Sequence, residues 1–290
     1  MQVDQVDHRW LRTHRFAVID ASRRDEVPVE WPCIPIAPAF LGADTDRCPV
    51  LLNLQRLPLV VQADFLDQLG EEVSARESTV ASLLLATEVS EESLLKHLTK
   101  RMVLILPSSQ EPKQFRYFDP GTFLQLPRYL GARGMAWLLG PVTSVWVPWA
   151  GEWGQFECPA AATGFRMSGS QLQALFDISV LNRVALQLDP PSDQNGWCET
   201  CAAIEIHLKR GRAHGLNSQK DLVGFCSHAM QWHPQFDEHP EIQQLLKALE
   251  AATPADELNY VELSRRIPME QWHRIQTELG QELVLKDTPP

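Results

Sequence analysis

The segment Lys113–Leu130, KQFRYFDPGTFLQLPRYL, brings aromatic side chains, arginines and an Asp-Pro pair close together, and it decides how the surrounding chain folds. Strand alternation over its first residues places Phe115 and Tyr117 on one face. It places Arg116 and Phe118 on the opposite face. The first part of the segment therefore predicts a short strand.

The second part of the segment has the pattern of a helix start. Asp119 is a favoured N-cap residue, and Pro120 suits the first helical position because the N–H of that position is not needed. Pro127 lies deeper than a helix tolerates well, so we expect a short or kinked helix. A catalytic alternative would make Asp119 an acid or base and Arg116 an anion clamp, but no second carboxylate lies nearby in the sequence. We therefore interpret the segment as a structural corner.

The first half of the chain alternates strand-like and helix-like segments. Apolar runs at 15–20 and 49–54 predict buried strands, whereas 79–86 fits either a strand or a buried helix. The segment 61–70 has apolar residues at helical spacing. The segment 90–101 begins with a serine cap and two glutamates and ends with basic residues, as the helix dipole favours.

The second half is dominated by helical patterns. Ser168 and Gln171 have the spacing of a capping box, which opens a helix over 171–188. Further helices are predicted, among them 218–232 and 256–279, the latter with a break at Pro268.

These patterns predict an α+β fold. We expect an N-terminal α/β lobe with a mixed sheet and flanking helices, followed by a C-terminal all-α lobe. The corresponding domains are 1–160 and 165–290.

Composition and charge exclude several function classes. The 290 residues carry a formal net charge of −11, and the short basic run Lys209–Arg212 does not offset it, so we expect no nucleic-acid partner. Residues 1–15 contain no hydrophobic run, so we expect no secretory signal, and we expect the six cysteines to be reduced thiols in a cytoplasm. The longest uncharged stretch, 134–151, is interrupted by Gly140-Pro141, so we expect two short strands around a turn and no membrane span.

Several separated motifs together resemble a known bacterial family. FRYFDP (115–120) is similar to that family's F-R-Y-Y-D-P signature, and FAVIDA (16–21) resembles its opening strand. Residues 90–98 resemble its helix ending in His-Leu, and Gly140-Pro141 with Trp146 resembles its closing element. The family comprises the effector chaperones, or adaptors, of type VI secretion systems. The matching positions are Asp20, His97, Phe115, Arg116, Tyr117, Phe118, Asp119, Pro120, Gly140 and Pro141.

The resemblance covers about residues 16–150 and implies a function in protein handling. Such a protein would bind a toxic effector in the cytoplasm and help to load it onto the spike protein VgrG. The family has no catalytic residues and no cofactor, so the resemblance implies none here, and the second half would recognise the cargo. Phe118, Gly121 and the proline-rich stretch 28–38 depart from the family pattern.

A group of aromatic residues forms the candidate protein-binding surface. Trp146, Trp149, Trp153 and Phe156 lie close together in sequence beside Pro148, and we expect Trp149 and Trp153 to remain partly exposed near turns. Aromatic side chains on a rigid surface are good anchors for an apolar segment of a partner. The alternative is that these side chains fill the core.

Cysteines and histidines supply the competing enzymatic hypothesis. Cys198 and Cys201 have the spacing of metal ligands, and His207, Cys226, His228 and His233 are possible additional ligands. Because the two cysteines are expected on a helix, we interpret them as buried thiols, reduced in a cytoplasm, and predict no metal site. We interpret the histidines of 227–241 as polar loop residues. A metal- or thiol-dependent enzyme and a general interaction scaffold remain the alternatives to a chaperone.

Overall fold

The computed structural model describes residues 2–3, 8–42, 44–105, 111–159, 164–188, 191, 193–251 and 258–286. The chain divides into two compact units. Unit 1 comprises residues 1–178 and 191–198, and unit 2 comprises 179–190 and 199–290. The division falls within a helix rather than at the sequence-based boundary of 160–165, most of which lies outside the described residues. The assignment of 1–160 and 165–290 to separate domains stays a prediction.

Unit 1 is built around a seven-stranded sheet with the order β1-β9-β8-β5-β2-β4-β3. Its strands are β1 (Gln2–Val3), β2 (Phe16–Ile19), β3 (Cys33–Pro35), β4 (Val50–Asn53), β5 (Ala81–Thr87), β8 (Val142–Trp149) and β9 (Glu152–Glu157). A separate two-stranded sheet joins β6 (Val103–Ile105) to β7 (Pro112–Gln114).

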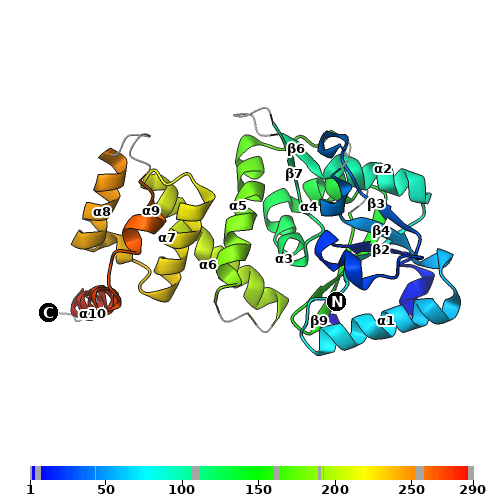
Figure 1. Cartoon of the computed structure of the whole chain (residues 1–290), viewed down its shortest axis with the longest axis horizontal. Coiled ribbons are helices and arrows are strands. Elements are labelled where there is room, and N and C mark those ends of the chain that lie inside the picture. The colour runs from blue at the N-terminus through cyan, green and yellow to red at the C-terminus, as the bar shows by residue number, and fades with distance from the viewer. Residues whose placement is uncertain are drawn as a thin grey trace. The chain divides into compact units, whose positions relative to one another are not determined.

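The α+β fold class is confirmed, but the sheet is antiparallel rather than mixed. Its central strands are buried on both faces, and β5 is buried along its whole length. Uninterrupted apolar strands of this kind are typical of parallel sheets, which explains the wrong expectation. Figure 1 shows why both faces of the sheet are buried. The helix α1 (Leu59–Ser74) covers one face, while α2 (Glu91–Arg101) and α4 (Leu126–Leu139) lie on the other.

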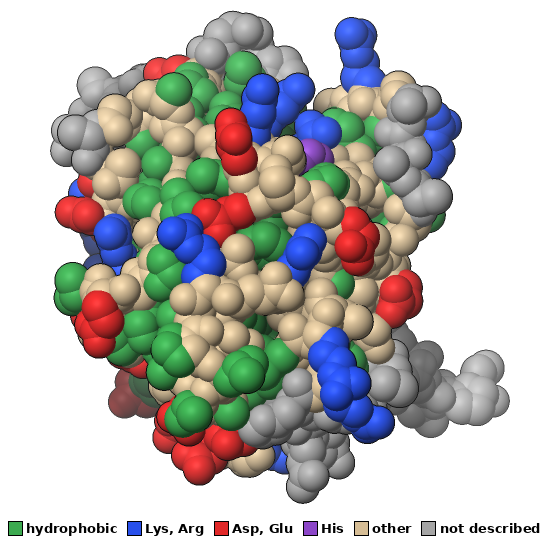
Figure 2. All heavy atoms as spheres, turned by 90° about the vertical axis from the view of Figure 1, so that its right-hand side faces the viewer, with side chains coloured by type: hydrophobic (Ala, Val, Ile, Leu, Met, Phe, Trp, Pro, Cys, Tyr) green, Lys and Arg blue, Asp and Glu red, His purple; other side chains and the backbone are tan. Residues whose placement is uncertain are grey.

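The packing of α1 follows strand alternation. Phe65, Leu66 and Leu69 of α1 form one buried cluster with side chains of the sheet, among them Ile19 and Leu52. The intervening residues of the same strands point to the opposite face and are also buried. Figure 2 shows one exposed side of unit 1, where basic and acidic side chains are interspersed among hydrophobic ones.

The stretch 134–151 differs from the sequence-based expectation of two strands. Its first part completes helix α4, which ends at Leu139, and only the part after Gly140 is a strand, β8. The strand β9 pairs with β8 instead. Leu138 and Leu139 are buried, and an apolar run that is buried on a helix cannot be distinguished by composition from one in a strand.

Unit 2 is helical. Its elements are parts of α5 (Gly169–Ala185) and α6 (Gln194–Ala213), followed by α7 (Gln219–Gln231), α8 (Pro240–Ala251), α9 (Tyr260–Ser264) and α10 (Met269–Lys286). The predicted break at Pro268 is confirmed, because α9 and α10 are separate helices. Residues 256–257 of that predicted helix lie outside the described residues.

The core of unit 2 forms between α7 and the helices around it. Phe225, Phe236 and Tyr260 are almost fully buried, and the Phe225 ring contacts both of the others. At the start of α5, the predicted capping box is present. The Ser168 N–H donates to Gln171 Oε1 (3.0 Å), and the Gln171 N–H donates to Ser168 Oγ (3.1 Å). None of the helices within the described residues is both long and apolar enough to cross a bilayer.

Candidate functional site

The aromatic hexapeptide forms a corner, as predicted, but its first residues are not a strand. The strand β7 ends at Gln114, and a turn follows in which the Asp119 N–H donates to the Arg116 carbonyl (3.1 Å). Phe115, Tyr117 and Phe118 are all buried, whereas Arg116 is exposed. The expected alternation of faces is therefore wrong, because a turn can direct neighbouring aromatic rings into the same core.

The helix start in this segment is confirmed. Asp119 Oδ1 accepts a hydrogen bond from the Thr122 N–H (2.8 Å), and Pro120 opens the short helix α3 (Pro120–Phe123). The next helix, α4, begins at Leu126 with Pro127 in its first turn, where proline is tolerated. Asp119 thus has a complete structural role as an N-cap residue.

An ion pair joins the corner to the opening strand. Arg116 Nη2 donates to Asp20 Oδ2 at 2.5 Å, although 96 residues separate the two in sequence. The other carboxylate oxygen, Asp20 Oδ1, accepts from the Ser22 N–H (2.9 Å) and from Ser22 Oγ (2.7 Å). The side chain of Asp20 is 12% exposed and that of Arg116 is 55% exposed, so the pair lies at the surface with its acidic member largely enclosed.

Tyr117 connects the corner to the end of α2. Its hydroxyl donates to the Leu98 carbonyl (3.2 Å), and burial raises the pKa of Tyr117 far above its usual value. The Phe115 N–H donates to the Met102 carbonyl (2.8 Å), which ties the same corner to the residue that ends α2. The corner and α2 therefore form one connected structure.

His97, also on α2, is held against the end of α4. Its Nε2 lies 2.8 Å from the Leu138 carbonyl, and the ring lies over Gly140, where a Cβ would come within 2.2 Å of His97 Cε1. Gly140 has a φ of +55°, a conformation that side chains disfavour. Burial lowers the pKa of His97, so the ring donates its Nε2 proton as a neutral imidazole near pH 7.

Pro141 is the last of the motif residues in this network. We refer to these residues together as the landmark residues: Asp20, His97, Arg116, Tyr117, Asp119, Gly140 and Pro141. The Pro141 carbonyl accepts from Thr87 Oγ1 (2.7 Å), which links the start of β8 to the end of β5. The residues singled out in the sequence thus form a series of contacts within unit 1. Each of them has a role in holding a turn, a helix end or an ion pair.

Gly121 leaves room for a tryptophan ring. Its carbonyl accepts from Trp197 Nε1 (3.0 Å), and a Cβ at this position would lie 2.9 Å from the Trp197 ring. The Trp149 ring approaches the same position at 3.3 Å. A larger residue at 121 is incompatible with this arrangement, so Trp197 fills the space that a larger side chain would need.

The aromatic group proposed as a protein-binding surface is mostly internal. Trp146 is 2% exposed and Trp153 is 0% exposed, and both belong to the core beneath α1, which corrects the expectation that Trp153 is partly exposed. Trp10 stacks on Trp146 at 4.0 Å between ring centroids. Trp149 and Phe156 are half-buried, so they are the members of the group that keep accessible surface. Sheet alternation explains the difference, because Trp153 follows the covered face of β9.

The cysteines and histidines do not assemble into a metal centre within the described residues, where no three possible ligands converge. Cys198 and Cys201 both lie on α6, and Cys198 Sγ lies 3.5 Å from the Leu124 carbonyl. His228 lies on α7 rather than in a loop, and its Nδ1 contacts the Tyr260 hydroxyl (2.7 Å). His239 follows a short 3-10 helix and is also buried. The loop interpretation of His228 is therefore wrong.

A buried His–Ser contact in unit 1 was missed in the sequence. His14 Nε2 lies 3.3 Å from Ser144 Oγ, and burial lowers the pKa of His14 to about 4. His14 Nδ1 contacts Thr13 Oγ1 (2.9 Å), whereas the carboxylate of Glu157 lies near the serine (3.5 Å). A catalytic triad needs the acid on the imidazole, so this geometry does not activate Ser144 as a nucleophile. No spacing in the sequence signals the contact, because 130 residues separate its members.

Trp232 and Trp272 line a pocket of unit 2 that the sequence does not signal. Trp232 and Trp272 are far enough apart in the chain that no local pattern links them.

No family model matches the chain, and neither does any curated protein or solved structure.

Proposed function

We propose that this chain is a cytoplasmic chaperone or adaptor that binds a type VI secretion effector and helps to load it onto the VgrG spike protein. It acts without catalysis and without a cofactor. Its partners are the effector and the spike protein, and neither nucleic acid nor a membrane takes part.

The observation that carries this proposal is the physical connection between the residues that resemble the family motifs. Arg116 pairs with Asp20, Tyr117 donates to the carboxyl end of α2, and His97 packs on Gly140. These residues come from four separate parts of the sequence. A chance similarity in four short motifs gives no reason for their members to contact one another, so the contacts support the resemblance.

The chemistry of the same residues supports a role in binding rather than in catalysis. Asp119 is engaged as a helix cap and Asp20 as the acceptor of three hydrogen bonds. A general acid or base would need one of these carboxylates to face a substrate. The landmark residues instead stabilise a scaffold that presents other surfaces to partners.

Co-purification tests the proposal directly. The tagged chain is co-expressed with the effector encoded beside it and with the spike protein, and complexes are separated by gel filtration. We expect the effector to elute with the chain, and the spike protein to join that complex. An effector from an unrelated secretion cluster serves as the control. Elution of the chain alone in the presence of both partners would reject the proposal.

A further inference from the structure

Unit 2 contains an aromatic pocket of about 320 Å³, which lies at the small end of the range of ligand pockets. Trp232 and Trp272 stack at 5.7 Å with 12° between their planes, and His228 lies against Trp272 at 4.5 Å. Val261 and Ile267 add aliphatic lining. Trp272 itself is only 5% exposed between these two rings, so the half-buried Trp232 supplies the accessible aromatic surface, with room beside it for a ring or for a pair of aliphatic side chains.

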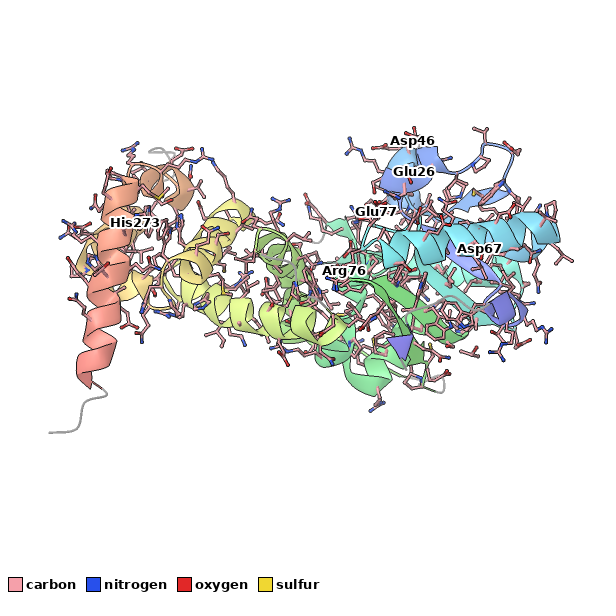
Figure 3. All side chains as sticks on the ribbon, turned by 90° about the horizontal axis from the view of Figure 1, so that it is seen from below. Glu26, Asp46, Asp67, Arg76, Glu77 and His273 are labelled. Atoms are coloured by element: carbon pink, nitrogen blue, oxygen red, sulfur yellow. The ribbon has the colours of Figure 1, made fainter. Side chains whose placement is uncertain are left out.

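The wall of the pocket is rigid and neutral. His228 is fixed by its contact with Tyr260, and burial lowers its pKa to about 4, so the imidazole is uncharged near pH 7. Figure 3 shows His273 on α10, and its ring meets Trp232 edge-on at 5.2 Å. A preorganised aromatic wall loses little conformational entropy on binding, which favours its use as an anchor site.

The rim of the pocket carries one charged residue, Arg265. Its side chain is exposed, and within the described residues the structure shows no ion pair for it. Glu262, three residues earlier on α9, forms an ion pair with Lys220 (3.6 Å). The pKa of Glu262 is lowered mainly by hydrogen bonding with the Asn259 side chain, and the positive charge of Arg265 also contributes to lowering it. Met269, also on the rim, is 61% exposed and can adapt to the shape of an occupant. The pocket thus combines an apolar interior with an exposed positive charge at its edge.

We propose that this pocket binds a segment of the cargo effector in which an aromatic or large aliphatic side chain lies next to a carboxylate. The apolar side chain would pack against Trp232, which Trp272 supports from within, and the carboxylate would pair with Arg265. Tryptophan and arginine are the residues that most often dominate binding energy at protein interfaces. The identity of the occupant as cargo rests on the proposed function, whereas its chemistry follows from the pocket.

The chemistry is tested with 3-phenylpropionate and 3-phenylpropylamine, which share an apolar body and differ in charge. Binding is followed by the NMR signals of the tryptophan indole N–H groups, with the Trp232 signal assigned from Trp232→Phe. We expect millimolar phenylpropionate to shift the Trp232 signal, and the amine to bind roughly fivefold more weakly because it meets Arg265 with like charge. Equal binding of both probes, or binding of neither, would overturn the proposal.

A matched pair of variants tests the role of Arg265. Arg265→Glu reverses the charge on the rim, while Arg266→Glu makes the same change at the next residue, which is exposed and outside the pocket lining. We expect Arg265→Glu to weaken both phenylpropionate and effector binding roughly tenfold, since an attractive pair becomes a repulsive one. Arg266→Glu should leave both unchanged. Circular dichroism of the two variants checks that each is folded.

The outcomes separate this inference from the proposed function. If all three proteins bind the effector equally, the pocket does not hold cargo and the inference is overturned, while the proposed function stands. If phenylpropionate binds but the wild-type chain binds no effector, the proposed function fails and the cargo assignment fails with it. If Arg265→Glu instead abolishes self-association measured by light scattering, the occupant is a second copy of the chain and the inference is overturned.

Discussion

Replacing Gly140 by alanine tests how tightly the landmark residues of unit 1 are joined. Gly140 has a φ of +55° and a ψ of −106°, and a side chain in such sparsely populated backbone costs about 1–3 kcal/mol. The new methyl group would also lie 2.2 Å from His97 Cε1, so the imidazole has to move. Its hydrogen bond to the Leu138 carbonyl (2.8 Å) is then lost, which costs about 1 kcal/mol more. We expect a total loss of roughly 2–4 kcal/mol.

Gly42→Ala is the matched control. Gly42 has nearly the same backbone angles, with φ 58° and ψ −124° against φ 55° and ψ −106° at Gly140, but nothing lies within 4 Å of its added Cβ. It should therefore show the backbone cost alone. The difference in cost between Gly140→Ala and Gly42→Ala therefore measures the contact with His97. When each glycine change is made separately in a His97→Ala background, this difference should disappear.

Hydrogen exchange measured by mass spectrometry is the assay, because it reports the opening free energy of peptides from β8 in unit 1 separately from unit 2. Equal destabilisation by Gly140→Ala and Gly42→Ala would refute the reasoning. An excess cost at Gly140 that persists without the His97 ring would refute it as well.

Three further predictions follow from the same structure. Asp119→Ala should lower the stability of unit 1 by about 1 kcal/mol, because the hydrogen bond that caps the Thr122 N–H is lost. Asp119→Asn should cost little, because asparagine also caps helices. Equal losses of stability in urea unfolding would contradict the cap role. Arg116→Ala should lower the stability of unit 1 by about 0.5–1 kcal/mol, because the arginine is exposed. Asp20→Ala should lower it by about 2 kcal/mol, because the hydrogen bonds from Ser22 are lost as well as the ion pair. The reverse order of these two losses in urea unfolding would be inconsistent with the geometry. The pKa of His228 is lowered by burial to about 4, below its unfolded value of 6.5, so the unfolded state binds the proton first and stability falls as the pH drops through this window. Between pH 7 and pH 5 this loss is about 2 kcal/mol, visible in the exchange of α7 amides, and it should be absent in His228→Asn.

Local signals in the sequence predicted the ends of elements well. Asp119 and Ser90 cap helices as expected, and Pro268 separates α9 from α10. Each of these features depends on residues within one turn of the chain, where side-chain chemistry determines the backbone.

Features that depend on distant segments were harder to predict. The antiparallel order of the sheet follows from which strands meet, and fully apolar strands such as β5 look the same in either direction. The burial of Trp153 depends on α1 covering that face of the sheet. The pocket around Trp232 and Trp272 requires three helices to come together, so the sequence showed its residues but not their arrangement.

The central claim is that the chain delivers one effector to a secretion apparatus, and secretion itself tests that claim most directly. The gene is deleted in the native bacterium, and the culture medium is assayed for the neighbouring effector and for a second effector of the same system. The account predicts that only the neighbouring effector disappears from the medium and that the wild-type gene restores it. Unchanged secretion of that effector in the deletion strain would contradict the account.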